Sequence, residues 1–146
     1  MTLGADGKIA DMYRRVSPGW KEAFADAHYR EGDAFHAFTL HGKRVVVGLC
    51  GDLWYDANID AIHQLHPDVA FWPVYTDFPA NEWNTAVKQE YAQQAGKLRC
   101  PVLYVNSLCK DKVGDDIARG GAALFVDGTI VQEVPSGEEN VLFVEI

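Results

Sequence analysis

The residues with the clearest chemical potential are Cys50 and its two successors, Gly51 and Asp52. Cys50 ends the run of residues 44–50, and Gly51 and Asp52 follow it. This run is apolar and rich in β-branched side chains, which predicts a strand buried on both faces. In α/β sheets, reactive groups gather just beyond the carboxyl ends of the strands. There, the amino end of the next helix stabilises a thiolate, and the Gly51 N–H is unobstructed as an oxyanion donor. We interpret Cys50 as a nucleophile; the alternative is a buried core cysteine.

The elements that would position this cysteine follow a regular pattern. A helix is expected over residues 56–65 and a longer one over 81–98, because both carry apolar side chains at helical spacing. The Asp127-Gly128 pair predicts a hairpin turn. Strands are expected over residues 44–50, 69–75, 101–106, 120–127, 129–134 and 141–146. Strands that alternate with helices and end in a hairpin predict a layered α/β fold, partly parallel, in one domain.

The first forty residues give a weaker signal. Residues 8–16 are consistent with an extended segment, and residues 20–28 have the composition of a short helix. Residues 34–40 alternate apolar and polar side chains. We therefore expect mixed structure there, without a domain boundary.

Composition excludes several classes of protein. The chain has 146 residues, is 48% hydrophobic and carries a formal charge of 13 − 21 = −8. A negative net charge argues against nucleic acid or an anionic membrane surface as a partner. No apolar run is long enough for a membrane span. Three cysteines without a CxxC pair argue against a disulfide framework. With no signal peptide visible at the amino end, we expect a cytoplasmic protein.

The stretch Val45-Val-Val-Gly-Leu-Cys50-Gly-Asp52-Leu-Trp54 resembles the nucleophile signature of the nitrilase superfamily, the carbon–nitrogen hydrolases. Residues 6–15 are similar to the strand of that family that ends in Tyr-Arg-Lys, 35 residues before the cysteine. Further similar segments lie at residues 29–33, 68–73, 103–106 and 120–128. The resemblance runs from about Asp6 to the end of the chain.

The resemblance implies part of a four-layer α-β-β-α sandwich, a mixed sheet with helices on one face. It also implies a cysteine nucleophile, a glutamate general base and a lysine that stabilises the oxyanion. Cys50 corresponds to the nucleophile and Gly51 to the backbone oxyanion donor. Arg15 stands at the place of the lysine, and Glu22 is the favoured match for a further glutamate, with residues 25–26 as the alternative.

Two departures from the family pattern bear on activity. Arg15 keeps the positive charge but cannot give up a proton near neutral pH, so it can hold an oxyanion without shuttling a proton. The alternative to a role in the site is that Arg14 and Arg15 form a basic pair exposed to solvent. The general-base glutamate belongs to the amino-terminal half of the family fold, which this chain is expected to lack.

Other residues are candidates for binding. Trp54 and Tyr55, just past Cys50, and Tyr75, at a strand end, are expected to line a substrate pocket or to pack in the core. His63 and His66 share a helical face but have no acidic or thiol ligands nearby, so neither a metal nor another cofactor is expected.

These observations predict a hydrolase that cleaves amide or nitrile carbon–nitrogen bonds of small molecules through a cysteine acyl-enzyme. The alternative is a catalytically silent fragment that serves as an assembly or regulatory subunit. In either case, a sheet that normally packs against a second sheet must bury its apolar face. We therefore expect a homo-oligomer or a partner chain that completes the fold.

Overall fold

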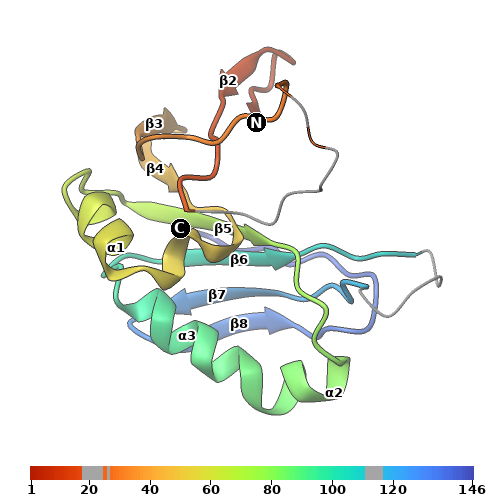
Figure 1. The fold of residues 1–146 in the computed structure, drawn as a ribbon. Coiled ribbons are helices and arrows are strands. Elements are labelled where there is room, and N and C mark those ends of the chain that lie inside the picture. Colours follow the sequence, from red (N-terminus) through yellow and green to blue (C-terminus); the bar gives the residue numbers. More distant parts are fainter. Residues whose placement is uncertain (18–24, 26, 111–116) are drawn as a thin grey trace.

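A computed structural model describes residues 1–17, 25, 27–110 and 117–146 of the chain. Its main feature is a six-stranded sheet with the order β3-β4-β5-β6-β7-β8 (Figure 1). The strands are β3 (Ala37–Leu40), β4 (Lys43–Val47), β5 (Val69–Val74), β6 (Val102–Asn106), β7 (Ala122–Val126) and β8 (Thr129–Val134). The three central strands, β4, β5 and β6, are parallel, whereas the outer pairs are antiparallel. The predicted mixed α/β sheet is confirmed.

Helices lie on one face of this sheet (Figure 1). They are a 3-10 turn η1 (Cys50–Trp54), α1 (Asp56–His63), α2 (Ala80–Glu82), a π-helical turn η2 (Trp83–Val87) and α3 (Lys88–Gly96). The helix expected over residues 81–98 is thus one run of α2, η2 and α3, and the helix expected over 56–65 ends at His63. Gly96 lets α3 approach the β7–β8 turn, since a Cβ there would meet the backbone of Gly128 at 2.6 Å.

Aromatic side chains fill the space between the sheet and the helices. Trp72 on β5 and Tyr104 on β6 are 0% and 2% exposed. Trp83 stacks on Tyr104 with ring centroids 4.7 Å apart, and Tyr91 on α3 stacks on Trp72 at 5.0 Å. Large rings bury much apolar area each, so this cluster is the main source of cohesion between the two layers.

The chain ends depart from expectation. The extended segment over residues 8–16 forms a strand only at β2 (Ile9–Asp11), which pairs with β1 (Thr2–Leu3) in a separate small sheet. The helix suggested over 20–28 falls mainly outside the described residues. The strand expected over 141–146 was wrong: these residues join no strand ladder in the described structure, and Phe143 is 85% exposed. The apolar side chains there instead include Val141, Leu142 and Val144, which line a groove on the sheet.

No helix in the described parts of the chain combines the length and the apolar character that a bilayer span requires.

Candidate active site

Cys50 occupies a sharp turn just past the carboxyl end of β4. The strand ends at Val47, earlier than the predicted residue 50, and Cys50 begins the 3-10 turn η1. Its φ angle is +49°, in the left-handed region that a residue with a Cβ rarely adopts. Such a conformation costs about 1–3 kcal/mol, and strained backbone of this kind clusters at functional sites. The turn leaves Cys50 partly exposed.

Strand β5 holds the turn from the side. The indole N–H of Trp72 donates a 2.8 Å hydrogen bond to the carbonyl oxygen of Cys50. The Sγ of Cys50 lies 4.0 Å from the carbonyl oxygen of Tyr75, the first residue after β5. The thiol is therefore located where the carboxyl ends of β4 and β5 meet, as the sequence predicts.

Asp52 anchors the turn to the amino-terminal segment. Its side chain is fully buried and accepts hydrogen bonds from the Tyr13 hydroxyl at 2.7 Å and from the backbone N–H groups of Leu49 at 2.8 Å, Ser17 at 2.7 Å and Val16 at 3.1 Å. Burial, followed by the bond to Asp52, raises the pKa of Tyr13 well above its usual value, so this hydroxyl keeps its proton. A buried carboxylate with this many donors is fully satisfied.

Arg15 reaches the turn from this same segment. Its Nε donates to the Ser17 hydroxyl at 2.9 Å, and a Cβ added at Gly51 would collide with its Nη2, so the guanidinium lies against Gly51. The Gly32 N–H donates to the Arg15 carbonyl at 2.8 Å, which brings the segment around residue 32 beside it. The structure therefore brings together Cys50, Gly51 and Arg15. Glu22 lies outside the described residues.

The three residues predicted to line a pocket occupy different places. Tyr75 is half exposed beside Cys50, and its hydroxyl lies 3.3 Å from the Sγ of Cys109. Trp54 is 42% exposed and packs edge-on against Tyr91 with ring centroids 5.0 Å apart, so it belongs to both surface and core. Tyr55 caps α1 through its carbonyl oxygen, and no described contact joins it to Cys50.

The sequence did not predict a pair of hydrogen bonds at the strand ends, between the Asn106 side chain and the Thr76 backbone. The side-chain amide of Asn106, at the end of β6, accepts from the Thr76 N–H at 3.0 Å and donates to the Thr76 carbonyl at 2.9 Å. This pair fixes the segment that follows β5, including the Tyr75 carbonyl next to the thiol. The sequence signal was a polar residue at the end of an apolar run, and the structure shows why it needs a partner, since Asn106 is 8% exposed.

Buried tyrosines lie beneath the same region. Burial raises the pKa of Tyr91 to about 12, and a negative charge on Cys50 adds to that rise. Burial likewise raises the pKa of Tyr104 far above its usual range. Both hydroxyls therefore remain protonated at neutral pH and contribute no charge to the site.

In the described segments, no carboxylate is hydrogen-bonded or ion-paired to Cys50, and no cluster of three or more His, Cys, Asp or Glu residues has metal-binding geometry. His63, one of the two histidines considered above, uses its ring nitrogen on the Lys97 carbonyl at 2.7 Å. The chemistry that these residues can supply is thus a thiol, a backbone donor and a fixed guanidinium.

No protein-family model matches the sequence, and no curated protein is similar enough in sequence to count as a relative. Solved structures do match. A glutamine-dependent NAD⁺ synthetase from Acinetobacter baumannii aligns with a TM-score of 0.75 and 21% identity, over 92% of this chain and 26% of that one. A carbon–nitrogen hydrolase from Helicobacter pylori G27 aligns with a TM-score of 0.67 and 17% identity, over 94% and 52%.

An amidase from Nesterenkonia aligns with a TM-score of 0.66 and 14% identity, over 92% of this chain and 51% of that one; in that structure, acrylamide has added to the active-site cysteine. This chain therefore spans about half of the length of the amidase and the hydrolase, and about a quarter of the synthetase. Over the part that it spans, the chain has the fold of this carbon–nitrogen hydrolase and of the Nesterenkonia amidase, which is an amidase from the nitrilase superfamily.

Proposed function

We propose that this chain carries the nucleophile of a hydrolase that acts on non-peptide carbon–nitrogen bonds, with small primary amides as the favoured substrates and nitriles as the alternative. The observation that carries the proposal is the strained turn at Cys50, with its thiol at the meeting point of β4 and β5 and the Arg15 guanidinium against the adjacent Gly51. A positive φ at a cysteine in this position has a cost, and the cysteine is partly exposed.

In this reaction, the Cys50 thiolate attacks the amide carbon and forms a C–S bond. The carbonyl oxygen becomes an oxyanion, and the proposal assigns its stabilisation to the Gly51 N–H and to the Arg15 guanidinium, which lies against Gly51. Collapse breaks the C–N bond, and the nitrogen takes a proton and leaves as ammonia. Water then adds to the thioester, releases the carboxylic acid and returns the thiol.

Proton transfer needs a group other than Arg15, because a guanidinium stays protonated. The described residues place no carboxylate on Cys50, so we propose that the general base comes from protein outside them. The fold neighbours support an amide substrate class: one is named as glutamine-dependent, and another carries acrylamide on its active-site cysteine.

Ammonia release from glutamine and from butyramide tests this proposal. We expect turnover by the chain in its complete assembly, abolished in Cys50→Ala and retained in Cys109→Ala, the matched change at the other cysteine near Tyr75. Equal activity in Cys50→Ala and the unchanged protein would overturn it.

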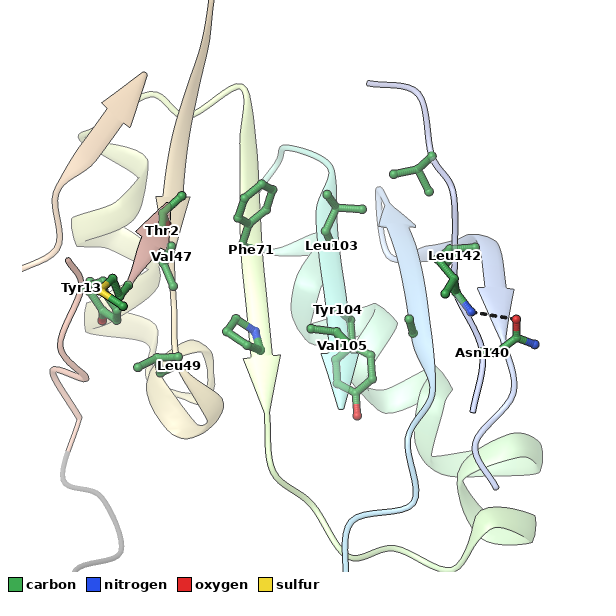
Figure 2. A pocket seen from close by; sticks show the side chains of 15 residues that line it. Thr2, Tyr13, Val47, Leu49, Phe71, Leu103, Tyr104, Val105, Asn140 and Leu142 are labelled. Carbon is green, nitrogen blue, oxygen red and sulfur yellow. Dashed lines mark hydrogen bonds between the residues drawn. The ribbon is translucent and has the colours of Figure 1, made fainter. Parts of the chain in front are cut away.

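We further propose that the sheet face opposite the helices is covered by a second copy of this chain or by a partner chain. This face carries a groove of about 560 Å³, lined by apolar side chains that include Val47, Phe71, Leu103 and Val105 (Figure 2). Figure 2 shows Phe71 and Leu103 side by side on neighbouring strands, with Val47 on one side and Leu142 on the other. An apolar surface this continuous favours a protein partner.

Light scattering at micromolar concentration tests the covering of this face. We expect a mass above that of one chain, and Val105→Asp, which places a charge on a half-exposed position of the groove, should shift the population toward monomer. Val131→Asp on the edge strand β8 is the control, because Val131 is equally exposed but does not line the groove. A clean monomer in the unchanged protein would exclude the second copy as the cover of this face.

A catalytically silent assembly or regulatory subunit is the second candidate. The absence of a carboxylate on Cys50 among the described residues and the open apolar face favour it. Turnover of a simple amide that disappears in Cys50→Ala would exclude this candidate.

A further inference from the structure

The buried carboxylate of Asp52 joins two parts of the chain that are far apart in sequence. One donor, the Leu49 N–H, belongs to the turn that carries the nucleophile. The other three, from Tyr13, Val16 and Ser17, belong to the segment that carries Arg15. Asp52 therefore fixes that segment relative to the turn.

Ser17 connects this anchor to the guanidinium. Its backbone N–H donates to Asp52 at 2.7 Å, and its hydroxyl accepts from the Arg15 Nε at 2.9 Å. Ser17 is 3% exposed, so water does not compete freely for either bond. The position of the guanidinium against Gly51 thus depends on a short chain of contacts that begins at Asp52.

We propose that Asp52 is a positioning residue, which acts through Ser17 to hold the Arg15 guanidinium across Gly51, so that an anion at Cys50 meets a positive charge in a fixed place. The reaction role of that anion rests on the function proposed above, whereas the holding of Arg15 does not. No described hydrogen bond joins Asp52 to the Cys50 thiol: its bond to the Leu49 N–H holds the turn, and its bond to the Ser17 N–H leads to Arg15.

The side-chain type fits this role. A carboxylate is an acceptor on both oxygens and can take four donors, as Asp52 does. An asparagine of the same shape would turn an NH₂ group toward N–H donors and leave part of the segment unbound. We therefore expect Asp52→Asn to loosen Arg15 even where the fold survives.

The test compares alkylation of Cys50 by iodoacetate and by iodoacetamide, which deliver nearly the same group with and without a negative charge. The ratio of the two rate constants, measured at the Cys50 peptide by mass spectrometry, reports the positive charge near the thiol. Arg15→Gln should lower this ratio about fivefold, as expected for loss of one nearby charge in a largely aqueous site. Asp52→Asn should lower it by a similar factor.

Ser17→Ala provides an independent variant in case Asp52→Asn does not fold. It removes the hydroxyl that receives Arg15 but keeps the backbone bond to Asp52, so the ratio should fall, and Ser17→Thr should restore it. Asp56→Asn is the matched control: it removes a carboxylate on the exposed start of α1 and should leave the ratio unchanged.

The outcomes separate this inference from the proposed function. A folded Asp52→Asn variant, or Ser17→Ala, that keeps the full ratio while Arg15→Gln lowers it would overturn the positioning role. An unchanged ratio in Arg15→Gln would also overturn it, because no positive charge would then be held at the thiol. Failure of the proposed function would instead appear as a Cys50 that reacts with iodoacetamide no faster than in the unfolded chain. The double variant Arg15→Gln/Asp52→Asn should show no further loss beyond either single change.

Discussion

One face of the six-stranded sheet is packed against α1 and α3, whereas the other carries apolar side chains that line an open groove. The two faces come from the same strands: on β5, Trp72 is fully buried beneath the helices, and its neighbour Phe71 points into the groove (Figure 2). On β6, Tyr104 and Val105 differ in exposure, at 2% and 50%, although Tyr104 also contributes to the lining of the groove. Neighbouring residues of similar apolar character therefore make very different contributions to the stability of the isolated chain.

The difference shows which properties the isolated chain can provide. The face packed against the helices supports the turn at Cys50, since the Trp72 indole donates a hydrogen bond to the Cys50 carbonyl oxygen. The open face carries the apolar groove, where we propose that a second copy of the chain or a partner chain packs. Cys50 lies at the strand ends between the two faces, and among the described residues no carboxylate is hydrogen-bonded to its thiol.

The largest expected effect separates the two faces directly. Trp72→Ala should lower the free energy of unfolding by about 3–5 kcal/mol, because it leaves a large cavity among packed rings. Phe71→Ala should cost less than about 2 kcal/mol, since its side chain is partly exposed already. Urea denaturation measures both. Equal losses would show that the two faces are equally packed, and a Phe71→Ala loss that grows with protein concentration would indicate a covered groove.

The anchor between the turn and the amino-terminal segment should have the next largest effect. Asp52→Asn should lower the free energy of unfolding by about 1–3 kcal/mol, because buried donors lose their acceptor. Asp56→Asn, which removes an exposed ion pair with Lys97, should change it by less than about 1 kcal/mol. Similar values for the two variants would refute the buried network.

The helical face should also respond to alkaline pH. Tyr91 has a folded-state pKa of about 12 against an ordinary value of 10, so folded and unfolded chains bind the same proton below pH 10. Above pH 10, the unfolded chain loses this proton first, and stability should fall by up to about 1.4 kcal/mol per pH unit from this group. Thermal unfolding between pH 8 and 11.5 should show a shallower decline in Tyr91→Phe. Tyr55→Phe, at an exposed tyrosine, serves as the control, and an identical decline in all three proteins would contradict the assignment.

The smallest expected effect concerns the strained turn between the faces. Cys50→Gly should be more stable than Cys50→Ala by about 1 kcal/mol, because glycine adopts a positive φ without strain. At Cys100, whose φ is not positive, the order should reverse. Denaturation of the four variants checks this, and the same order at both sites would show that the turn is unstrained.

The sequence predicts the parts of this molecule that local patterns encode. Apolar runs located β4, β5 and β6, and Asp127-Gly128 located the turn of the β7–β8 hairpin. The residues around Cys50 indicated a turn at a strand end. These features depend on neighbours in the chain, and the structure confirms them.

The remaining features depend on contacts between distant residues. A run such as β5 shows that its side chains are apolar, but not which of Phe71 and Trp72 is covered. The tail containing Phe143 is an apolar run like that of a strand, yet its pairing depends on whether another strand lies beside it. The bond from Tyr13 to Asp52 crosses 39 positions, and no local pattern encodes such a separation.

The proposed function requires that the turn present Cys50 as an activated nucleophile. Its most direct test is the rate constant for iodoacetamide alkylation of each cysteine at neutral pH in the native assembly, compared with the same cysteine in urea. We predict that Cys50 reacts faster in the native protein than in the unfolded chain. Cys100 should be protected, because burial raises its pKa to about 11. Native Cys50 that reacts no faster than unfolded Cys50 would contradict the claim.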